Sequence, residues 1–342
     1  MKLSDFDYHL PQQLIAQKPV SPRDHSRLMV LDKKKKTIIH RHFYDLPDYL
    51  NKGDVLVLNN TKVFPARLMG HRKDTGGQVE VFLLRESGRG VWEVLIGNRR
   101  KKVGQVIQFG KGLECQIIKQ IDASIWQVRF NQSGSRFDKL VEALGQIPLP
   151  PYIKSSEKKS KLQGQYQTVY AKTKGSVAAP TAGFHFTKPL LIKLKKKGVQ
   201  IEYVTLHVGL GTFAPVKVND IKKHQMHSEW ASIDKKTAER LNQAKRQGHR
   251  IIAVGTTSSR TLESFAGKGK IKSGNQWTNI FIYPGYQFKF VDSMITNFHL
   301  PKSTLMMLIS ALAGRSFILK AYQEAVKKSY RFYSFGDAMF IT

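Results

Sequence analysis

The pattern of strands and helices changes abruptly on either side of residues 70–146, and this change constrains the fold more than any other feature of the chain. Within that stretch, short strand-like runs follow one another closely and helical periodicity is scarce, which is typical of a small antiparallel barrel. Pro148, Pro150 and Pro151 follow, and their fixed φ angles and missing N–H donors suit a linker. The strands predicted there cover residues 78–84, 91–96, 103–109, 113–121 and 124–130.

Outside that stretch, strands alternate with helices, which favours an α/β layer structure with a largely parallel sheet. The clearest helix covers residues 188–197, because Thr187 suits its N-cap, Pro189 its first turn and Gly198 its end. The remaining predicted elements are a hairpin of residues 28–31 and 37–43, strands at 55–58, 199–206, 250–254 and 279–282, a helix at 236–246, and helices beginning near Ser258, Ser303 and Ser316.

The charge of the chain predicts an anionic partner. Lysine and arginine total 56 against 25 acidic residues, which gives a net charge of +31. Solvated lysine-rich faces could account for any single run, but phosphate contacts are the usual use of such an excess. The apolar run at 305–313 is far shorter than the ~20 residues of a membrane span, so we expect nucleic acid rather than a membrane.

Two features predict a cytoplasmic location. The first ten residues include Asp5, Asp7 and His9 and have no apolar segment typical of a secretory signal. Cys115 is the single cysteine, so no internal disulfide is possible, which fits a reducing compartment.

Three predicted strand exits carry residues suited to chemistry. In HVGLGTF, residues 207–213, Gly209 and Gly211 would let the backbone approach a ligand closely. A dinucleotide fingerprint is disfavoured there, since the third glycine is missing and no helix opens at 214–215. In TNFHLP, residues 296–301, His299 suits either a site residue or a hydrogen-bonded core histidine.

The third exit is GTTSSRTLE at residues 255–263, where four consecutive hydroxyl residues open a helix. The free N–H groups and the dipole at such a helix start attract a carboxylate or a phosphate. Hydroxyls at this position also serve as helix caps. Four in a row exceed what capping uses, so we expect a ligand there.

Standard metal and nucleotide motifs are missing from the sequence. His224, His227 and Glu229 cluster, but one cysteine and the lack of H-E-x-x-H leave no standard ligand set, and we expect no metal. Neither a G-x-x-x-x-G-K-[ST] loop nor a G-x-S-x-G elbow is present.

Taken together, these segments resemble the S-adenosylmethionine:tRNA ribosyltransferase-isomerase family of the queuosine pathway, from end to end of the chain. Departures from the family pattern are LQGQ at 162–165, Ala214 and Ser259. The matching segments are RDHSRL (23–28), LNNTKVFPAR (58–67), IPLPPYI (147–153), YQTVYA (166–171), AAPTAGFHFT (178–187), HVGLGTF (207–213), HSE (227–229), GTTSSRTLE (255–263), YPG (283–285), TNFHLP (296–301), YRF (330–332) and GDAM (336–339).

The resemblance implies an enzyme that transfers and isomerises the ribosyl group of S-adenosylmethionine onto 7-aminomethyl-7-deazaguanine at the tRNA wobble position. Epoxyqueuosine would form, and adenine and methionine would be released. S-adenosylmethionine would be a co-substrate, with no prosthetic group, and we expect a monomer. The implied fold is α/β, with a larger α/β domain of residues 1–69 and 148–342 and an inserted small antiparallel β-barrel domain of residues 70–147.

This chemistry assigns hypothetical roles to individual residues. Acid and base groups are needed because protons next to a sulfonium are acidic and adenine must leave. Aligned N–H donors and a guanidinium suit the methionine carboxylate, and a carboxylate suits the Watson–Crick edge of the deazaguanine, which we assign to Asp337. We assign acid-base roles to His207, His299, Glu229 and Asp292, donor or substrate binding to Thr256, Thr257, Ser258, Arg260, Gly209, Gly211, Asn297 and Asp337, and tRNA binding to Arg23, Arg27, Asn60, Lys62 and Arg67.

Two other classes of function remain open at this point. A tRNA methyltransferase would use the same donor but would produce S-adenosylhomocysteine. A non-catalytic RNA-binding protein would explain the basic charge, but it does not require hydroxyl-rich strand ends.

Overall fold

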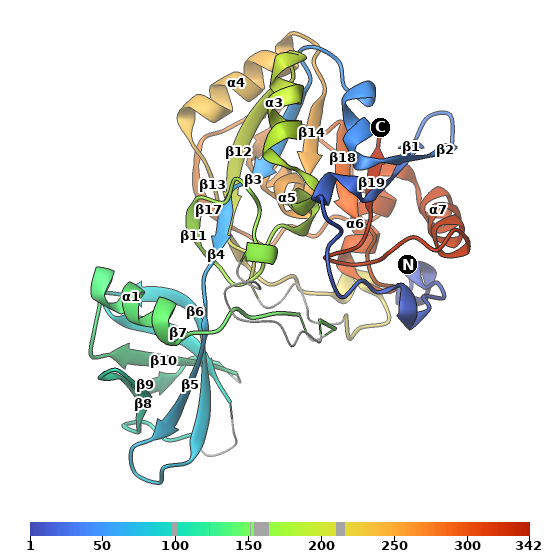
Figure 1. The fold of residues 1–342 in the computed structure, drawn as a ribbon. Coiled ribbons are helices and arrows are strands. Elements are labelled where there is room, and N and C mark those ends of the chain that lie inside the picture. Colours follow the sequence, from blue (N-terminus) through green and yellow to red (C-terminus); the bar gives the residue numbers. More distant parts are fainter. Residues whose placement is uncertain (98–100, 123, 151, 154–163, 210–215) are drawn as a thin grey trace.

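The protein consists of a large α/β body with a smaller β-barrel beside it (Figure 1). In this computed structural model, residues 1–97, 101–122, 124–150, 152–153, 164–209 and 216–342 are described. The two chain segments that lead into and out of the barrel lie side by side, because the backbones of Arg67 and Gln146 exchange hydrogen bonds of 3.1 and 2.8 Å. A Cβ atom at Gly145 would lie 2.0 Å from the Pro65 carbonyl oxygen, so this close approach requires glycine.

Nine strands form the main sheet within the described residues. The four central strands, β12, β3, β14 and β18, run parallel, and β19 and β1 also pair in parallel, whereas the other four pairs are antiparallel. The prediction of a largely parallel sheet is therefore right for the centre and wrong for the flanks. In spatial order the strands are β17 (Gly274–Thr278), β13 (Glu229–Ile233), β12 (Gln200–Leu206), β3 (Val55–Asn59), β14 (Ile251–Val254), β18 (Ser293–Asn297), β19 (Ala338–Ile341), β1 (Arg27–Asp32) and β2 (Thr37–His42).

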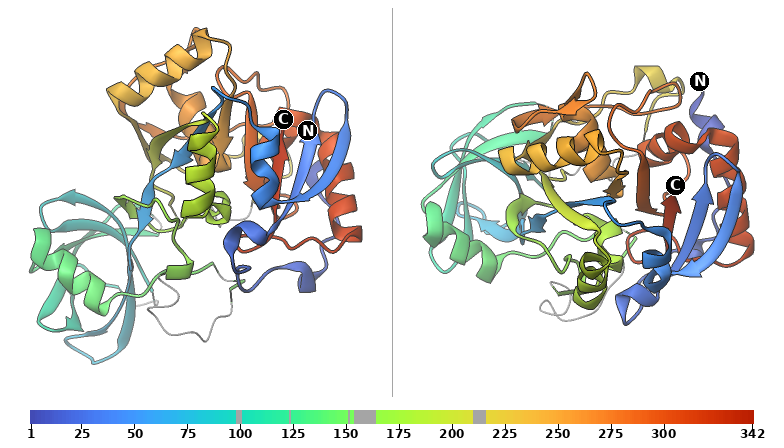
Figure 2. Two further views of the ribbon diagram at one scale, coloured as in Figure 1. Left: turned by 45° about the horizontal axis from the view of Figure 1, so that its top comes forward. Right: turned by 90° about the horizontal axis from the view of Figure 1, so that it is seen from above.

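Helices cover both faces of the sheet (Figure 2), and side-chain alternation along the strands builds a core on each face. Val55 and Val57 of β3 pack toward one group of helices, and Leu56 and Leu58 pack toward the other, as period-two geometry requires. The first group is α4 (Lys235–Arg246), α5 (Gly255–Phe265), α6 (Thr304–Ala313) and α7 (Arg315–Lys327), and the second is α3 (Lys188–Lys196) with the 3₁₀ helices η4 (Phe43–Tyr49) and η5 (Thr181–His185). Further 3₁₀ turns are η1 (Leu3–Phe6), η2 (Gln12–Leu14), η3 (Arg23–His25) and η7 (Ile221–Lys223).

The barrel closes through six antiparallel strands in the described part of the chain. Its core is apolar, and helix α1 (Gly134–Leu144) contributes Phe137 and Val141 to it. The sequence analysis missed this helix, whose two buried residues are one turn apart. Around the barrel the strands are β10 (Ile125–Phe130), β7 (Val91–Ile96), β6 (Gln78–Gly88), β5 (Arg67–Arg72), β8 (Val106–Gly110) and β9 (Leu113–Gln120). The domain boundaries at 69/70 and 147/148 stay a prediction.

Two small ribbons complete the fold. Strand β4 (Thr61–Val63) continues from the end of β3 and pairs in parallel with β11 (Thr173–Ser176), next to the barrel. Strands β15 (Ala266–Gly267) and β16 (Lys270–Ile271) form a short hairpin. The β4–β11 ribbon therefore places residues of β3's carboxyl end beside the entrance to the barrel.

One predicted strand is misplaced. Residues 279–282 are not a strand; the edge strand β17 lies just before them, at Gly274–Thr278. Its sequence, GNQWT, is polar because one face of an edge strand stays exposed, so no hydrophobic run marks it. Among the described helices, none alone has the length and apolarity of a membrane span. Helices α6 and α7 together have that length and composition, but they are bent by 115° where they meet.

Candidate functional site

A pocket lies beyond the carboxyl ends of β14 and β18, where ligands bind in open α/β sheets. Strand β14 passes directly into α5 at Gly255, whose φ of 87° is readily adopted by glycine. Strand β18 ends at Asn297 and leads through Leu300 to α6, which Ser303 caps by accepting a hydrogen bond from the Met306 N–H. Two helices thus begin at the pocket, and both present the positive ends of their dipoles there.

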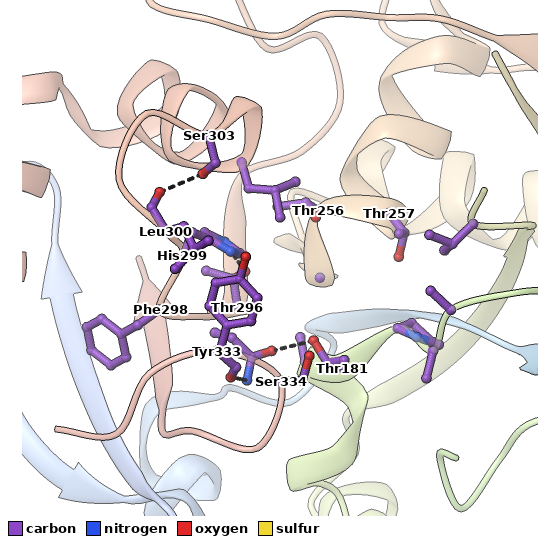
Figure 3. Close-up of a pocket in the computed structure, with 18 of the residues that line it drawn as sticks. Thr181, Thr256, Thr257, Thr296, Phe298, His299, Leu300, Ser303, Tyr333 and Ser334 are labelled. Carbon is purple, nitrogen blue, oxygen red and sulfur yellow. Dashed lines mark hydrogen bonds between the residues drawn. The ribbon is translucent and has the colours of Figure 1, made fainter. Parts of the chain in front are cut away.

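Counting its open mouth, the pocket encloses about 740 Å³ of space. Figure 3 shows Thr256 and Thr257 on one side and Thr296, His299 and Tyr333 on the other. Among the described residues, the lining is Tyr152, Tyr166, Ala178, Ala179, Pro180, Thr181, Ala182, Val208, Gly255, Thr256, Thr257, Thr296, Asn297, Phe298, His299, Leu300, Ser303, Leu305, Tyr333 and Ser334.

Helix α5 is buried on nearly all sides although it is rich in polar residues. Burying hydroxyls without partners is costly, yet the side-chain oxygens of Thr257, Ser258 and Ser259 have no hydrogen-bond partner among the described residues. No side chain caps the start of the helix, so its first N–H groups remain available. Thr256 and Thr257 line the pocket, whereas Ser258 lies outside the lining. The helix start therefore suits an anionic group.

A buried hydrogen-bond chain holds one wall of the pocket. The Asn297 amide nitrogen donates to His185 Nε2 at 3.1 Å, and its oxygen accepts from the Thr181 hydroxyl at 3.1 Å. His185 Nε2 is therefore the acceptor, so the proton on Nδ1 donates to Ser26 Oγ at 2.7 Å. The Tyr333 carbonyl also accepts from Asn297, at 3.2 Å. Asn297 thus lines the pocket, and its own side chain orients Thr181.

His299 also lines the pocket. Its Nε2 lies 2.9 Å from Thr296 Oγ1, and its backbone N–H donates to the Tyr322 hydroxyl at 2.9 Å. The Tyr8 hydroxyl donates to its carbonyl. Burial lowers the pKa of His299 from 6.5 to about 3, so the imidazole is neutral near pH 7. His299 is thus hydrogen-bonded in the core and also faces the pocket, and its role as a site residue stays a prediction.

Because His185 and His299 are both held neutral, stability is expected to fall in mild acid. Burial, with Arg331 and Arg23 contributing, lowers the pKa of His185 to about 3. The unfolded chain takes up these protons near pH 6.5, so the stabilisation is complete above that pH and is lost progressively toward pH 3. We expect the free energy of unfolding to drop by roughly 2 kcal/mol between pH 6.5 and 5.5 from these two groups. Urea denaturation at both pH values measures it, and an unchanged stability would contradict it.

Glu229, at the start of β13, and Arg260, in α5, form a buried ion pair. Glu229 is 4% exposed and Arg260 is 6% exposed. One carboxylate oxygen meets the Arg260 guanidinium, and the other accepts from the Gly209 N–H at 3.0 Å. The guanidinium also donates to the Ile280 carbonyl at 3.3 Å. Arg260 is therefore engaged by the protein's own carboxylate, and neither residue lines the pocket.

His207 lies next to the pocket and does not line it. Its Nδ1 is 2.8 Å from Thr61 Oγ1, and its ring stacks on Trp230 at a centroid distance of 5.0 Å and an angle of 15°. Burial lowers the pKa of His207 to about 4.

Two predicted carboxylates lie away from the pocket. Asp292 precedes β18, at the opposite edge of the sheet, where it accepts from the Ile251 N–H at 2.8 Å and from Lys245 Nζ at 2.6 Å. Asp337 is buried and holds Arg27 and the Arg331 N–H, the latter at 2.8 Å. The geometry therefore gives both groups structural partners rather than a place in the pocket.

Most of the cations predicted to bind tRNA have partners within the protein. Arg23 donates to the carbonyls of Gly164, Gln165 and Gln167 at 3.1, 2.6 and 2.9 Å. Arg27 pairs with Asp337, and Arg67 pairs with Glu80 at 2.6 Å. Lys62 is exposed on β4. The Asn60 side chain accepts from Thr205 Oγ1 at 2.8 Å. Lys62 is thus the best placed of these five residues to contact phosphate.

Some predicted positions lie outside the described residues, namely Gly211, Ala214 and the first part of the 162–165 departure. Ser259 is fully buried in α5. Within the described chain, no cluster of three or more histidine, cysteine or acidic side chains could hold a metal ion. Sequence reasoning missed Thr181, His185, Tyr333 and Ser334 as parts of the site, although the segments that contain the first two were among those that carried the family resemblance.

The fold and the pocket are typical of one class of protein: an α/β enzyme with its ligand pocket between two helix starts at the carboxyl edge of its sheet. The family model of queuosine biosynthesis proteins matches residues 3–341. The chain is 54% identical over 344 residues to the S-adenosylmethionine:tRNA ribosyltransferase-isomerase of Clostridium kluyveri, with both chains fully covered. It is 37% identical to the crystal structure of the S-adenosylmethionine tRNA ribosyltransferase of Thermotoga maritima, with a TM-score of 0.57 over 99% of this chain and 100% of that one.

The chain therefore belongs to the queuosine biosynthesis family of S-adenosylmethionine:tRNA ribosyltransferase-isomerases, which makes it an enzyme of the transferase and isomerase type.

Proposed function

We propose that this enzyme transfers and isomerises the ribosyl group of S-adenosylmethionine onto 7-aminomethyl-7-deazaguanine at the tRNA wobble position. The products are epoxyqueuosine in the tRNA, free adenine and free methionine. One observation carries the proposal: a chain that matches ribosyltransferase-isomerases over its full length has a pocket between two helix starts that suits a nucleoside bearing an amino acid. S-adenosylmethionine acts as a co-substrate.

The methionine end of the donor fits the start of α5. A carboxylate there accepts hydrogen bonds from the free N–H groups of the first turn and from the Thr257 hydroxyl, which has no partner among the described residues. The start of α6 at Ser303 adds a second positive helix end to the same pocket. Arg260 pairs with Glu229 and does not line the pocket, so we assign it no part in this contact.

His299 is proposed as the imidazole that acts on the donor. Of the four residues predicted for acid-base roles, it is the one within the pocket lining. A histidine whose pKa is about 3 is neutral but weakly basic, so its expected contribution is a hydrogen bond to the reacting nucleoside. The Thr296 hydroxyl at 2.9 Å fixes the orientation of the ring.

Product analysis tests the proposed reaction. The purified enzyme is incubated with S-adenosylmethionine and an anticodon stem-loop that carries 7-aminomethyl-7-deazaguanine. We expect equimolar adenine and methionine by chromatography, together with a modified nucleoside in the digested RNA. S-adenosylhomocysteine would instead indicate a methyltransferase, and RNA binding without any product would indicate a non-catalytic protein.

Contact between Lys62 and an RNA phosphate predicts a specific salt effect. Replacing Lys62 by Gln should weaken binding of the stem-loop and reduce the slope of log K against log salt by about 1. Lys195→Gln, at an exposed position on α3, is the control and should leave the slope unchanged. Fluorescence anisotropy at salt concentrations between about 50 and 200 mM measures the slopes. Equal slopes for wild type and Lys62→Gln would show that Lys62 does not contact the RNA.

A further inference from the structure

Three ring side chains lie in a row across the barrel-side strands of the main sheet. Leu206 and Ala231 are register partners on β12 and β13, so the next pair outward is His207 and Trp230, whose backbones are joined by a hydrogen bond of 2.9 Å. Trp230 is in turn the register partner of Trp277 on β17. Residues that pair across strands point to the same face. We refer to His207, Trp230 and Trp277 as the tryptophan row.

The tryptophan row is on the face of these strands opposite α5. Ala231 and Ile233 of β13 are buried in the core that includes α5, and Thr278 of β17 is also buried, so the alternating residues Trp230 and Trp277 point the other way. Trp277 is 49% exposed, which is a large apolar surface for a single residue on an edge strand. The sheet thus presents a half-exposed indole ring next to a stacked imidazole-indole pair.

Cationic groups flank the tryptophan row on both sides. The Arg85 guanidinium, from β6 of the barrel, lies 4.8 Å above the Trp277 ring and is held by Glu93. At the other end, His207 contacts the β4–β11 ribbon, on which Lys62 and Lys174 are register partners and are both exposed. An aromatic surface between cations is complementary to a polymer of flat bases and phosphates, in a chain of net charge +31.

We propose that the tryptophan row is a stacking site for unpaired nucleobases of the RNA substrate, with Trp277 as the principal ring. The inference rests on the proposed function for the identity of the RNA. Single-stranded loops are recognised in this way because every base has a face that stacks on an aromatic ring. His207 adjoins Val208, which lines the pocket, and two strand spacings of about 4.8 Å separate the His207 and Trp277 positions. A base on Trp277 therefore belongs to a nucleotide close to the one that enters the pocket.

Two variants of Trp277 test the site. Trp277→Ala should bind the anticodon stem-loop about 5- to 150-fold more weakly than wild type, the range for loss of one base-aromatic stack. Trp277→Phe should restore most of the affinity, because a phenyl ring also stacks. The control is Tyr44→Ala, which removes a different exposed aromatic ring, one that stacks on His42 at 5.1 Å and 6°. Binding of S-adenosylmethionine, measured by calorimetry, should be unchanged in all three and reports that they are folded.

Each outcome decides a separate question. Equal RNA affinity for wild type and Trp277→Ala, or an equal loss in Tyr44→Ala, would overturn the inference whether or not the RNA is modified. Selective loss of affinity in Trp277→Ala would support the stacking site even if wild type left the RNA chemically unaltered, which would refute the proposed function alone. The enzyme could also self-associate through this surface. If that self-association disappears in Trp277→Ala while RNA affinity stays constant, the tryptophan row is a protein contact and the inference is overturned.

Discussion

Replacing His299 by Ala is expected to slow single-turnover release of adenine by about 10²–10³-fold, the usual cost of deleting one positioned hydrogen-bonding group in an active site. His299 lines the pocket, and its ring is oriented by Thr296 at 2.9 Å. His299→Asn should recover part of the loss, because an amide can still donate and accept. Rapid quench with chromatographic detection of adenine measures the rate.

The pH dependence of the wild-type rate separates a hydrogen-bonding role of His299 from proton abstraction. A histidine with a pKa near 3 does not titrate between pH 5.5 and 8, so the wild-type rate should show no ionisation from this group in that interval. His71→Ala, at an exposed position on β5 of the barrel, is the control and should retain full activity. A loss of less than threefold in His299→Ala would exclude His299 from the reaction.

Replacing Glu229 by Gln is expected to lower the free energy of unfolding by about 3–5 kcal/mol, because it leaves the Arg260 cation buried without its counter-charge. Both side chains are almost fully buried, and the amide retains one oxygen for the Gly209 N–H. Urea denaturation at pH 7 measures the change.

A double-mutant cycle distinguishes this pair from ordinary surface charge. Glu229→Gln combined with Arg260→Met should lose much less stability than the sum of the two single variants, since no charge is left unpaired. Asp7→Asn breaks the exposed ion pair with Lys302 and should cost no more than about 1 kcal/mol. Additive losses in the cycle would show that Glu229 and Arg260 do not act as a pair.

Local sequence signals predicted the architecture wherever periodicity was strong. The helix predicted at 188–197 is α3 (Lys188–Lys196), capped by Thr187 as expected, and the close-spaced strands after Gly70 do form a barrel. The edge strand β17 was missed because its sequence is polar, and α1 was missed because two buried residues produce a weak signal. Strand direction at the flanks depends on tertiary pairing, which no local pattern encodes.

The site was predictable at strand ends and not beyond them. Thr256 and Thr257 follow β14, and Asn297 and His299 lie at or just after the end of β18. The parallel pairing of these two strands therefore brings all four residues to one pocket. Asp292 precedes its strand and therefore lies at the opposite edge.

Arg260 and Asp337 carry suitable charges, but buried charges require partners, and the partners come from distant segments that sequence reasoning cannot place. His185 was missed for the same reason, since its role depends on Ser26 and Asn297.

The proposed function requires that the pocket between the starts of α5 and α6 hold the sulfonium nucleoside beside the target base. A crystal structure of the enzyme with S-adenosylmethionine and an anticodon stem-loop tests it most directly. We expect the donor's carboxylate within hydrogen-bonding distance of the Thr256 and Thr257 N–H groups, with its ribose facing His299 and the deazaguanine. A donor bound elsewhere, for instance at the Asp292 edge of the sheet or within the barrel, would contradict it.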